Sequence, residues 1–288
     1  MANFPIIDCL YSPEARAGDK ARLSIEASEQ RAAPSVECSE TPASLLERMD
    51  GFGMTQVLLS PCRKWTCERH WMCGEIQTDE IVNYIAAAPH RFAGLAGYNP
   101  YAISESLLQL SASVRMQDMR GVYVPTENST VALGHARMYP LYARCVELNV
   151  PVMTQVGLSG QVAHPSELEQ IAADFPEVTL VAAWSGAMDA GVATRLCEQR
   201  DQVYVAFNGL DASESVCDWL DLWAGMGRCM WGSNGRPWHD VLTSLHTAGL
   251  NETTLQKFLH DNAVRVFRLD RASAQPWRDA NPIAVAER

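Results

Sequence analysis

Residues 150–184 read VPVMTQVGLSGQVAHPSELEQIAADFPEVTLVAAW. Two short apolar runs, VPVMTQ at 150–155 and VTLVAAW at 178–184, flank the segment HPSELEQIAADF at 164–175, whose apolar residues recur at helical spacing. Uninterrupted apolar runs of this length are typical of strands that are buried on both faces in a parallel sheet. The stretch therefore predicts a strand, a crossover helix and a second parallel strand.

The same alternation continues through the rest of the chain. Helix candidates at 104–119 and 136–149 separate further apolar runs, and the total number of runs is eight. The other six runs are FPIID (4–8), TQVLLS (55–60), FAGLAGY (92–98), RGVYVP (120–125), VYVAF (203–207) and RCMWGS (228–233). Eight parallel βα units close into a barrel, so the sequence predicts an α/β chain with a (β/α)8 TIM-like barrel.

The boundaries of this barrel can also be placed. We expect a single domain over residues 1–288, with the barrel at about 4–269 and a tail at 270–288. A polar segment at about 10–40 follows the first run and predicts a long loop after strand 1. Thr41 before Pro42 predicts a helix start, and Ser166 with Glu169 predicts a capping box.

Composition narrows the range of partners and compartments. The chain has 288 residues, of which 47% are hydrophobic and 20% charged, and its formal net charge is −11. An acidic chain is a poor partner for nucleic acid or an anionic membrane, because both require a cationic patch. No apolar run approaches the roughly 20 residues that span a bilayer, and no cationic segment precedes the first apolar run. We therefore expect a soluble, cytoplasmic protein without a nucleic-acid or membrane partner.

Several long motifs, in the order of the predicted strands, resemble the amidohydrolase superfamily. They are IIDCLYS (6–12), PHRFAGLAGYNP (89–100), YPLYARCVELNVPVMTQVG (139–157), HPSELEQIAADFPEVTLVAAWSG (164–186), CMWGSN (229–234) and DNAVRVFRL (261–269). The resemblance is to the branch of aminocarboxymuconate-semialdehyde decarboxylase and related hydrolases, and it extends from Phe4 to about Leu269. It implies a metal-dependent site at the C-terminal ends of the barrel strands.

The chain departs from this family at the residues that the resemblance assigns to the metal. The family pattern places two histidines after the first strand, one after the fifth, one after the sixth and an aspartate after the eighth. The corresponding residues here are Leu10, Ser12, Gln155, Trp184 and Asn234. The preceding Asp8 is kept.

These replacements are poor metal ligands. Leu10 has no lone pair, and the indole of Trp184 offers only an N–H donor. Ser12, Gln155 and Asn234 are neutral oxygen donors, whereas such sites prefer imidazole and carboxylate. Asn234 also cannot accept a proton from a metal-bound water. We therefore expect no catalytic metal in this chain.

The tryptophans near these positions suggest what fills the space. We expect Trp184, with Trp231 and Trp238 nearby, to pack into the vacated barrel mouth. Their indole N–H groups would then reach Asn234 or Gln155.

A cysteine-rich stretch, SPCRKWTCERHWMCGE at 60–75, carries a second candidate site. Its spacing is C-x4-C-x2-H-x2-C, which would place Cys67, His70 and Cys73 on one helix face or in a tight loop, with Cys62 folding back onto them. Three thiolates and an imidazole suit a closed, structural zinc site. The alternative interpretation is unrelated buried thiols beside a surface histidine.

The interpretation of the barrel mouth leaves several functions open. The leading hypothesis is a catalytically silent subunit that associates with a homologous, metal-bearing chain acting on a small carboxylated molecule. The alternative is a metal-independent hydrolase or lyase of the lactonase or decarboxylase type, and a third reading is a binding module without turnover. In the alternative, Arg63 or Lys64 would bind a substrate carboxylate and Asp8 or His239 would transfer a proton. Gln155 and Asn234 would then hydrogen-bond an oxyanion.

Overall fold

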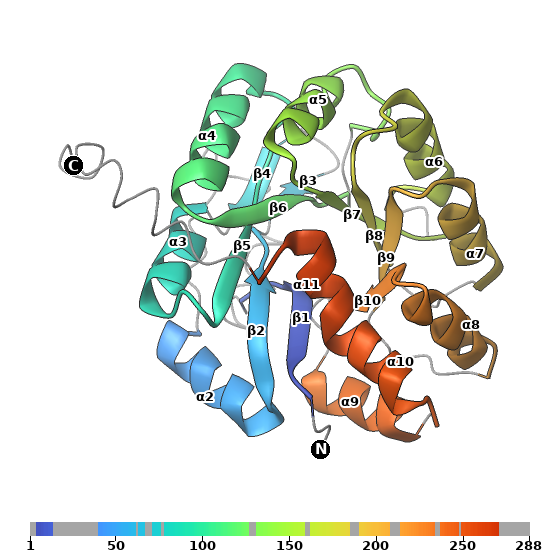
Figure 1. The fold of residues 1–288 in the computed structure, drawn as a ribbon. Coiled ribbons are helices and arrows are strands. Elements are labelled where there is room, and N and C mark those ends of the chain that lie inside the picture. Colours follow the sequence, from blue (N-terminus) through green and yellow to red (C-terminus); the bar gives the residue numbers. More distant parts are fainter. Residues whose placement is uncertain are drawn as a thin grey trace.

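Each of the eight apolar runs forms a strand, and the eight strands lie in one parallel sheet that closes almost completely into a barrel (Figure 1). The computed structural model describes residues 4–13, 40–61, 63–66, 71–75, 78–126, 131–158, 162–184, 190–207, 214–233, 237–247 and 249–270. The barrel strands, in their order around the sheet, are β1 (Ile6–Tyr11), β2 (Met54–Leu59), β5 (Phe92–Ala96), β6 (Met119–Val124), β7 (Val152–Val156), β8 (Leu180–Trp184), β9 (Val203–Phe207) and β10 (Cys229–Trp231). The predicted (β/α)8 barrel is confirmed.

Helices follow the strands and form an outer layer around the barrel (Figure 1). They are α2 (Pro42–Phe52), α3 (Thr78–Ala87), α4 (Ile103–Met116), α5 (Tyr139–Leu148), α6 (Pro165–Asp174), α7 (Ala190–Gln199), α8 (Glu214–Gly225) and α9 (Trp238–Thr247). One further helical run comprises α10 (Glu252–Gln256), the π-helical turn η1 (Lys257–Asp261) and α11 (Asn262–Phe267). None of the described helices is long and apolar enough to cross a membrane.

Two apolar clusters account for the burial of both strand faces. One cluster lies between the strands and the outer helices and includes Leu45, Trp184 and Trp231. The other fills the barrel interior and contains Ile7, Cys9, Leu10, Leu58, Ala93, Leu95, Tyr123, Met153, Val181, Ala183, Ala206 and Met230. Because successive strand residues point to opposite faces, each strand contributes to both clusters.

The run α10–η1–α11 covers the N-terminal end of the barrel. Val266 and Phe267 of α11 join the interior cluster, and Figure 1 shows α11 crossing the centre of the barrel. Arg268, just after α11, donates a hydrogen bond of 2.8 Å to the carbonyl oxygen of Asn149, which precedes β7. The C-terminal end of the barrel is thus the end left for a site, as in barrel enzymes generally.

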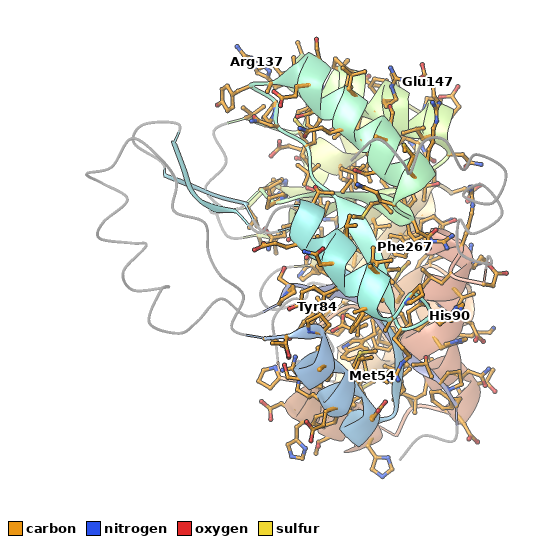
Figure 2. The ribbon with its side chains drawn as sticks, turned by 90° about the vertical axis from the view of Figure 1, so that its left-hand side faces the viewer. Met54, Tyr84, His90, Arg137, Glu147 and Phe267 are labelled. Atoms are coloured by element: carbon orange, nitrogen blue, oxygen red, sulfur yellow. The ribbon has the colours of Figure 1, made fainter. Side chains whose placement is uncertain are left out.

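The described part of the cysteine-rich stretch is extended and does not form a helix face, while the loop that carries Cys67 and His70 lies outside the described residues. Residues Arg63–Thr66 (β3) and Trp71–Glu75 (β4) pair as a two-stranded antiparallel hairpin outside the barrel sheet. Figure 2 shows this hairpin on the side of the barrel opposite to His90, which precedes β5. Antiparallel extended backbone places alternate residues on opposite faces, so the helical i, i+3, i+6 spacing does not apply to the part that is described.

Helix starts were predicted correctly in one case and misplaced in another. Thr41 caps α2 with Pro42 in its first turn, as expected. The capping box of α6 is formed by His164 and Glu167, two residues before the expected pair Ser166 and Glu169. Nδ1 of His164 accepts the backbone N–H of Ser166 at 3.3 Å, in the position that a serine, threonine or aspartate oxygen more often takes.

Candidate functional site

Asp8 is a buried acid in the middle of β1, and both of its carboxylate oxygens accept hydrogen bonds. Oδ1 accepts the backbone N–H groups of Leu10 at 3.1 Å and Ser233 at 2.9 Å. Oδ2 accepts the indole N–H of Trp238 at 2.8 Å. The side chain is fully buried. Asp8 is therefore an internal hydrogen-bond acceptor, and no substrate can reach it in this conformation.

The protonation of Asp8 reflects a competition between burial and these donors. Burial raises its pKa from the ordinary value of 3.8 to about 6, and the hydrogen bonds from Ser233, Trp238 and Leu10 limit the rise. Removal from water disfavours a carboxylate, whereas N–H donors favour it. Burial therefore favours the protonated form of Asp8, and the N–H donors of Leu10, Ser233 and Trp238 favour the carboxylate.

The two positions after Asp8 that the family resemblance assigns to histidines carry no ligand chemistry. Leu10 is 2% exposed and belongs to the interior apolar cluster. The hydroxyl of Ser12 lies 2.7 Å from the hydroxyl of Ser60, which follows β2. The end of β1 therefore offers the mouth one apolar side chain and one hydroxyl that already has a hydrogen-bonding partner.

Gln155 on β7 does lie on the interior face of the barrel. It pairs in register with Ala183, an interior residue of β8. Its backbone carbonyl accepts the hydroxyl of Thr126 at 2.6 Å, but its buried side-chain Oε1 has no hydrogen-bond partner in the part of the chain that the structure describes. A buried acceptor without a donor costs free energy of folding. Among the described residues at the family's metal positions, Gln155 is the one whose side chain has a buried oxygen without a donor.

Trp184 does not fill the barrel mouth, contrary to the expectation from the sequence. It pairs in register with Val156, one residue beyond the Gln155–Ala183 pair, and so faces the outer helices. Trp231 packs in the same outer cluster. Trp238 does take part in the network at the strand ends, and its indole N–H donates to Asp8 instead of Asn234 or Gln155.

The remaining candidate residues divide into exposed and undescribed ones. His239 is exposed on the first turn of α9 and is not brought together with Asp8. Arg63 and Lys64 belong to β3, of which only the backbone is described. Cys73 belongs to β4 in the same way, while Cys62, Cys67, His70 and Asn234 lie outside the described residues.

The described donors do not fit the family's divalent metal. Leu10 supplies no donor atom, the oxygens of Asp8 are occupied by N–H groups, and Gln155 offers one neutral oxygen. Within the described ranges, no group of three or more His, Cys, Asp or Glu side chains is arranged to hold an ion. No chemical step through a metal can be derived from these side chains.

Comparison with known proteins identifies the family. The amidohydrolase family model matches residues 68–269. The chain belongs to the amidohydrolase family. The chain matches no curated protein significantly by sequence.

Several solved structures share the fold of this chain at low sequence identity. An uncharacterised TIM-barrel protein of Bordetella bronchiseptica is 19% identical with a TM-score of 0.69, and the match covers 92% of this chain and 99% of that one. The 5-carboxyvanillate decarboxylase of Sphingomonas paucimobilis is 13% identical with a TM-score of 0.67, covering 92% and 99%. A dihydroxybenzoic acid decarboxylase of Polaromonas with bound manganese is 14% identical with a TM-score of 0.64, covering 93% and 98%.

Proposed function

We propose that this chain is a non-catalytic member of the amidohydrolase family, a subunit that associates with a homologous chain carrying an intact metal site. The observation that carries the proposal is the apolar, buried Leu10 beside an Asp8 whose two oxygens both accept N–H groups. An ion at the strand ends would need imidazole or free carboxylate ligands, and neither residue supplies one. The barrel itself is intact, and its outer surface remains available for association with another chain.

The chemistry of the partner is proposed from the structural neighbours. Two of them are named as decarboxylases of carboxylated aromatic molecules, and one of these holds manganese. The partner would accordingly hydrolyse, decarboxylate or hydroxylate a small carboxylated molecule with its own metal. The present chain would hold that partner in an active assembly.

The contact surface is proposed to lie outside the barrel mouth. The segment at about 10–40, the cysteine-rich stretch and the tail after Leu269 are the parts of the sequence least typical of a barrel. A structural zinc ion on Cys62, Cys67, His70 and Cys73 would stabilise the second of these, and it stays a prediction.

Restoring one family ligand should not restore a metal site. In Asn234→Asp, the added carboxylate would still have Leu10 and Ser12 in place of two imidazoles. We expect no divalent ion in the barrel mouth and no hydrolysis, as measured by metal analysis of purified wild type and variant. Because zinc on the cysteine-rich stretch would appear in both proteins, the result is the difference between them. One additional metal ion per chain in the variant would contradict the proposal.

Truncation of the tail should affect the complex more than changes in the mouth. We expect loss of residues 270–288 to weaken association and lower the turnover of the partner while the barrel stays folded. In contrast, Gln155→Ala and Asn234→Ala should change that turnover less than twofold, because neither side chain contacts the partner's substrate. Size-exclusion chromatography and turnover of the reconstituted complex are the measurements. Loss of activity in the alanine variants with an unaffected truncation would refute the silent-subunit function.

The second candidate function is a metal-independent hydrolase or lyase, and one observation favours it. The buried Oε1 of Gln155 has no donor among the described residues and could accept a hydrogen bond from a substrate hydroxyl or amide. Turnover by the isolated chain that survives chelation and is lost in Gln155→Ala would establish this function instead.

A further inference from the structure

The junction between the first and last barrel strands, β1 and β10, lacks the backbone hydrogen bonds that join the other neighbouring strands in the described residues. Hydrogen-bonded ladders join each strand to the next from β1 round to β10, but none of the described ladders joins β10 back to β1. The two strands nevertheless pack together. At this seam the chain needs a substitute for the missing backbone hydrogen bonds.

We propose that Asp8 and Trp238 form a lock that closes this seam through the backbone N–H groups of Leu10 and Ser233, without any metal ion. Asp8 lies on β1, Ser233 follows β10, and Trp238 begins α9. One carboxylate thus binds donors from the first strand and from the last βα unit. This inference goes beyond the proposed function, because it concerns how the barrel stays closed whichever function the chain has.

Close backbone approach supports the lock. A Cβ atom built on Gly232 would lie 3.1 Å from both the sulfur of Cys9 and the Cβ of Leu10. Such contacts are tighter than side chains usually make, so the end of β10 can approach β1 this closely because residue 232 is glycine. The hydroxyl of Ser233 also donates to the carbonyl of Leu10, at 3.4 Å.

The ring of Trp238 is itself fixed from the first βα unit. It packs against Tyr11 with ring centroids 5.4 Å apart and against Phe52 of α2 at 5.9 Å. The guanidinium of Arg48, also on α2, lies 4.7 Å from the Trp238 ring centroid. Figure 1 shows α2 and α9 on either side of β1. Contacts from the first βα unit therefore hold the indole of Trp238, which belongs to the last βα unit, with its N–H toward Asp8.

The matching of donors and acceptors indicates a specific role for the indole N–H. Trp219 and Trp223 on α8 are buried as well, but their N–H groups have no hydrogen-bond partner among the described residues. Tryptophan at these two positions serves packing alone. At position 238 the indole N–H donates to Oδ2 of the buried Asp8 at 2.8 Å, and hydrogen bonds to a carboxylate are stronger than those between neutral groups.

The lock can be tested by hydrogen exchange at the amides of Leu10 and Ser233. Trp238→Phe keeps an aromatic ring but removes the N–H donor to Asp8. We expect exchange at both amides to accelerate about ten- to a hundredfold, the range for loss of one hydrogen bond to a charged group. Trp219→Phe is the matched control, since it removes the same indole group from an equally buried position without a partner, and it should leave both amides protected.

Two further measurements guard against a general loss of stability. Asp8→Asn keeps an oxygen for the two backbone donors but turns an amide N–H toward Trp238, so its effect should shrink when it is combined with Trp238→Phe. Full additivity of the two substitutions would show that Asp8 and Trp238 act independently and would overturn the lock. Protection in wild type should survive chelation. Its loss on chelation would mean that an ion closes the seam.

Discussion

Replacing Asn262 with aspartate should lower the free energy of unfolding by about 4 kcal/mol, because it leaves an uncompensated charge in the protein interior. Asn262 begins α11 and is 3% exposed. Its side-chain Nδ2 donates hydrogen bonds to the carbonyl oxygens of Ala224 at 2.9 Å and Cys229 at 2.7 Å. These two bonds fasten the helical run under the barrel to the end of α8 and the start of β10. An aspartate would present negative oxygens to the same two carbonyls.

The prediction is checked by urea unfolding followed by circular dichroism. Asn262→Ala should cost less, about 2 kcal/mol, because it leaves two carbonyls without a donor but adds no charge. Asn149→Asp is a suitable control: this exposed side chain already accepts a hydrogen bond from Arg268 through its oxygen, so the same chemical change should alter stability by less than about 1 kcal/mol. Equal unfolding midpoints for Asn262→Asp and wild type would show that the helical run is held by packing alone.

The fold could be predicted from the sequence because its signals are local and repeated. Each apolar run is short, and each is followed by residues with helical periodicity, so the eightfold alternation is visible without any contact information. The β3–β4 hairpin was missed because its segment contains mainly polar residues and cysteines, whose spacing was interpreted as metal ligation. The local sequence pattern alone cannot distinguish a β-hairpin from a metal-binding loop.

The candidate site was predictable only in part. The sequence places Leu10 where the family resemblance implies a histidine. The structure adds that this leucine is buried in the interior cluster. The orientation of Trp184 depends on its position along β8, because neighbouring strand residues point to opposite faces of the sheet. An error of one residue in the sequence therefore moves the expected side chain from the barrel interior to the outer face. The role of Trp238 could not be inferred, because its partner Asp8 lies 230 residues earlier in the chain.

The stability of this protein should fall as the pH rises from about 4 to 7, relative to that of Asp8→Asn. Burial raises the pKa of Asp8 from 3.8 to about 6, so between these values the folded state binds more protons than the unfolded state. Stability then decreases with pH, and the contribution of the protonated group, fully present below about pH 4, is lost as the pH rises through 6. A shift of two pKa units corresponds to about 3 kcal/mol.

Comparison with Asp8→Asn isolates this effect from the other acidic residues of the chain. The amide is similar in size, does not titrate and meets Trp238 equally at every pH, so its own cost is a constant offset. The difference in unfolding free energy between the two proteins, measured in urea at half-unit steps from pH 4 to 7.5, should therefore change by about 3 kcal/mol against wild type. A constant difference would mean that Asp8 keeps the same charge in both states. A change in the opposite sense would mean that the N–H groups of Leu10, Ser233 and Trp238 stabilise the carboxylate by more than burial penalises it, and that ionised Asp8 contributes net stability to the closed seam.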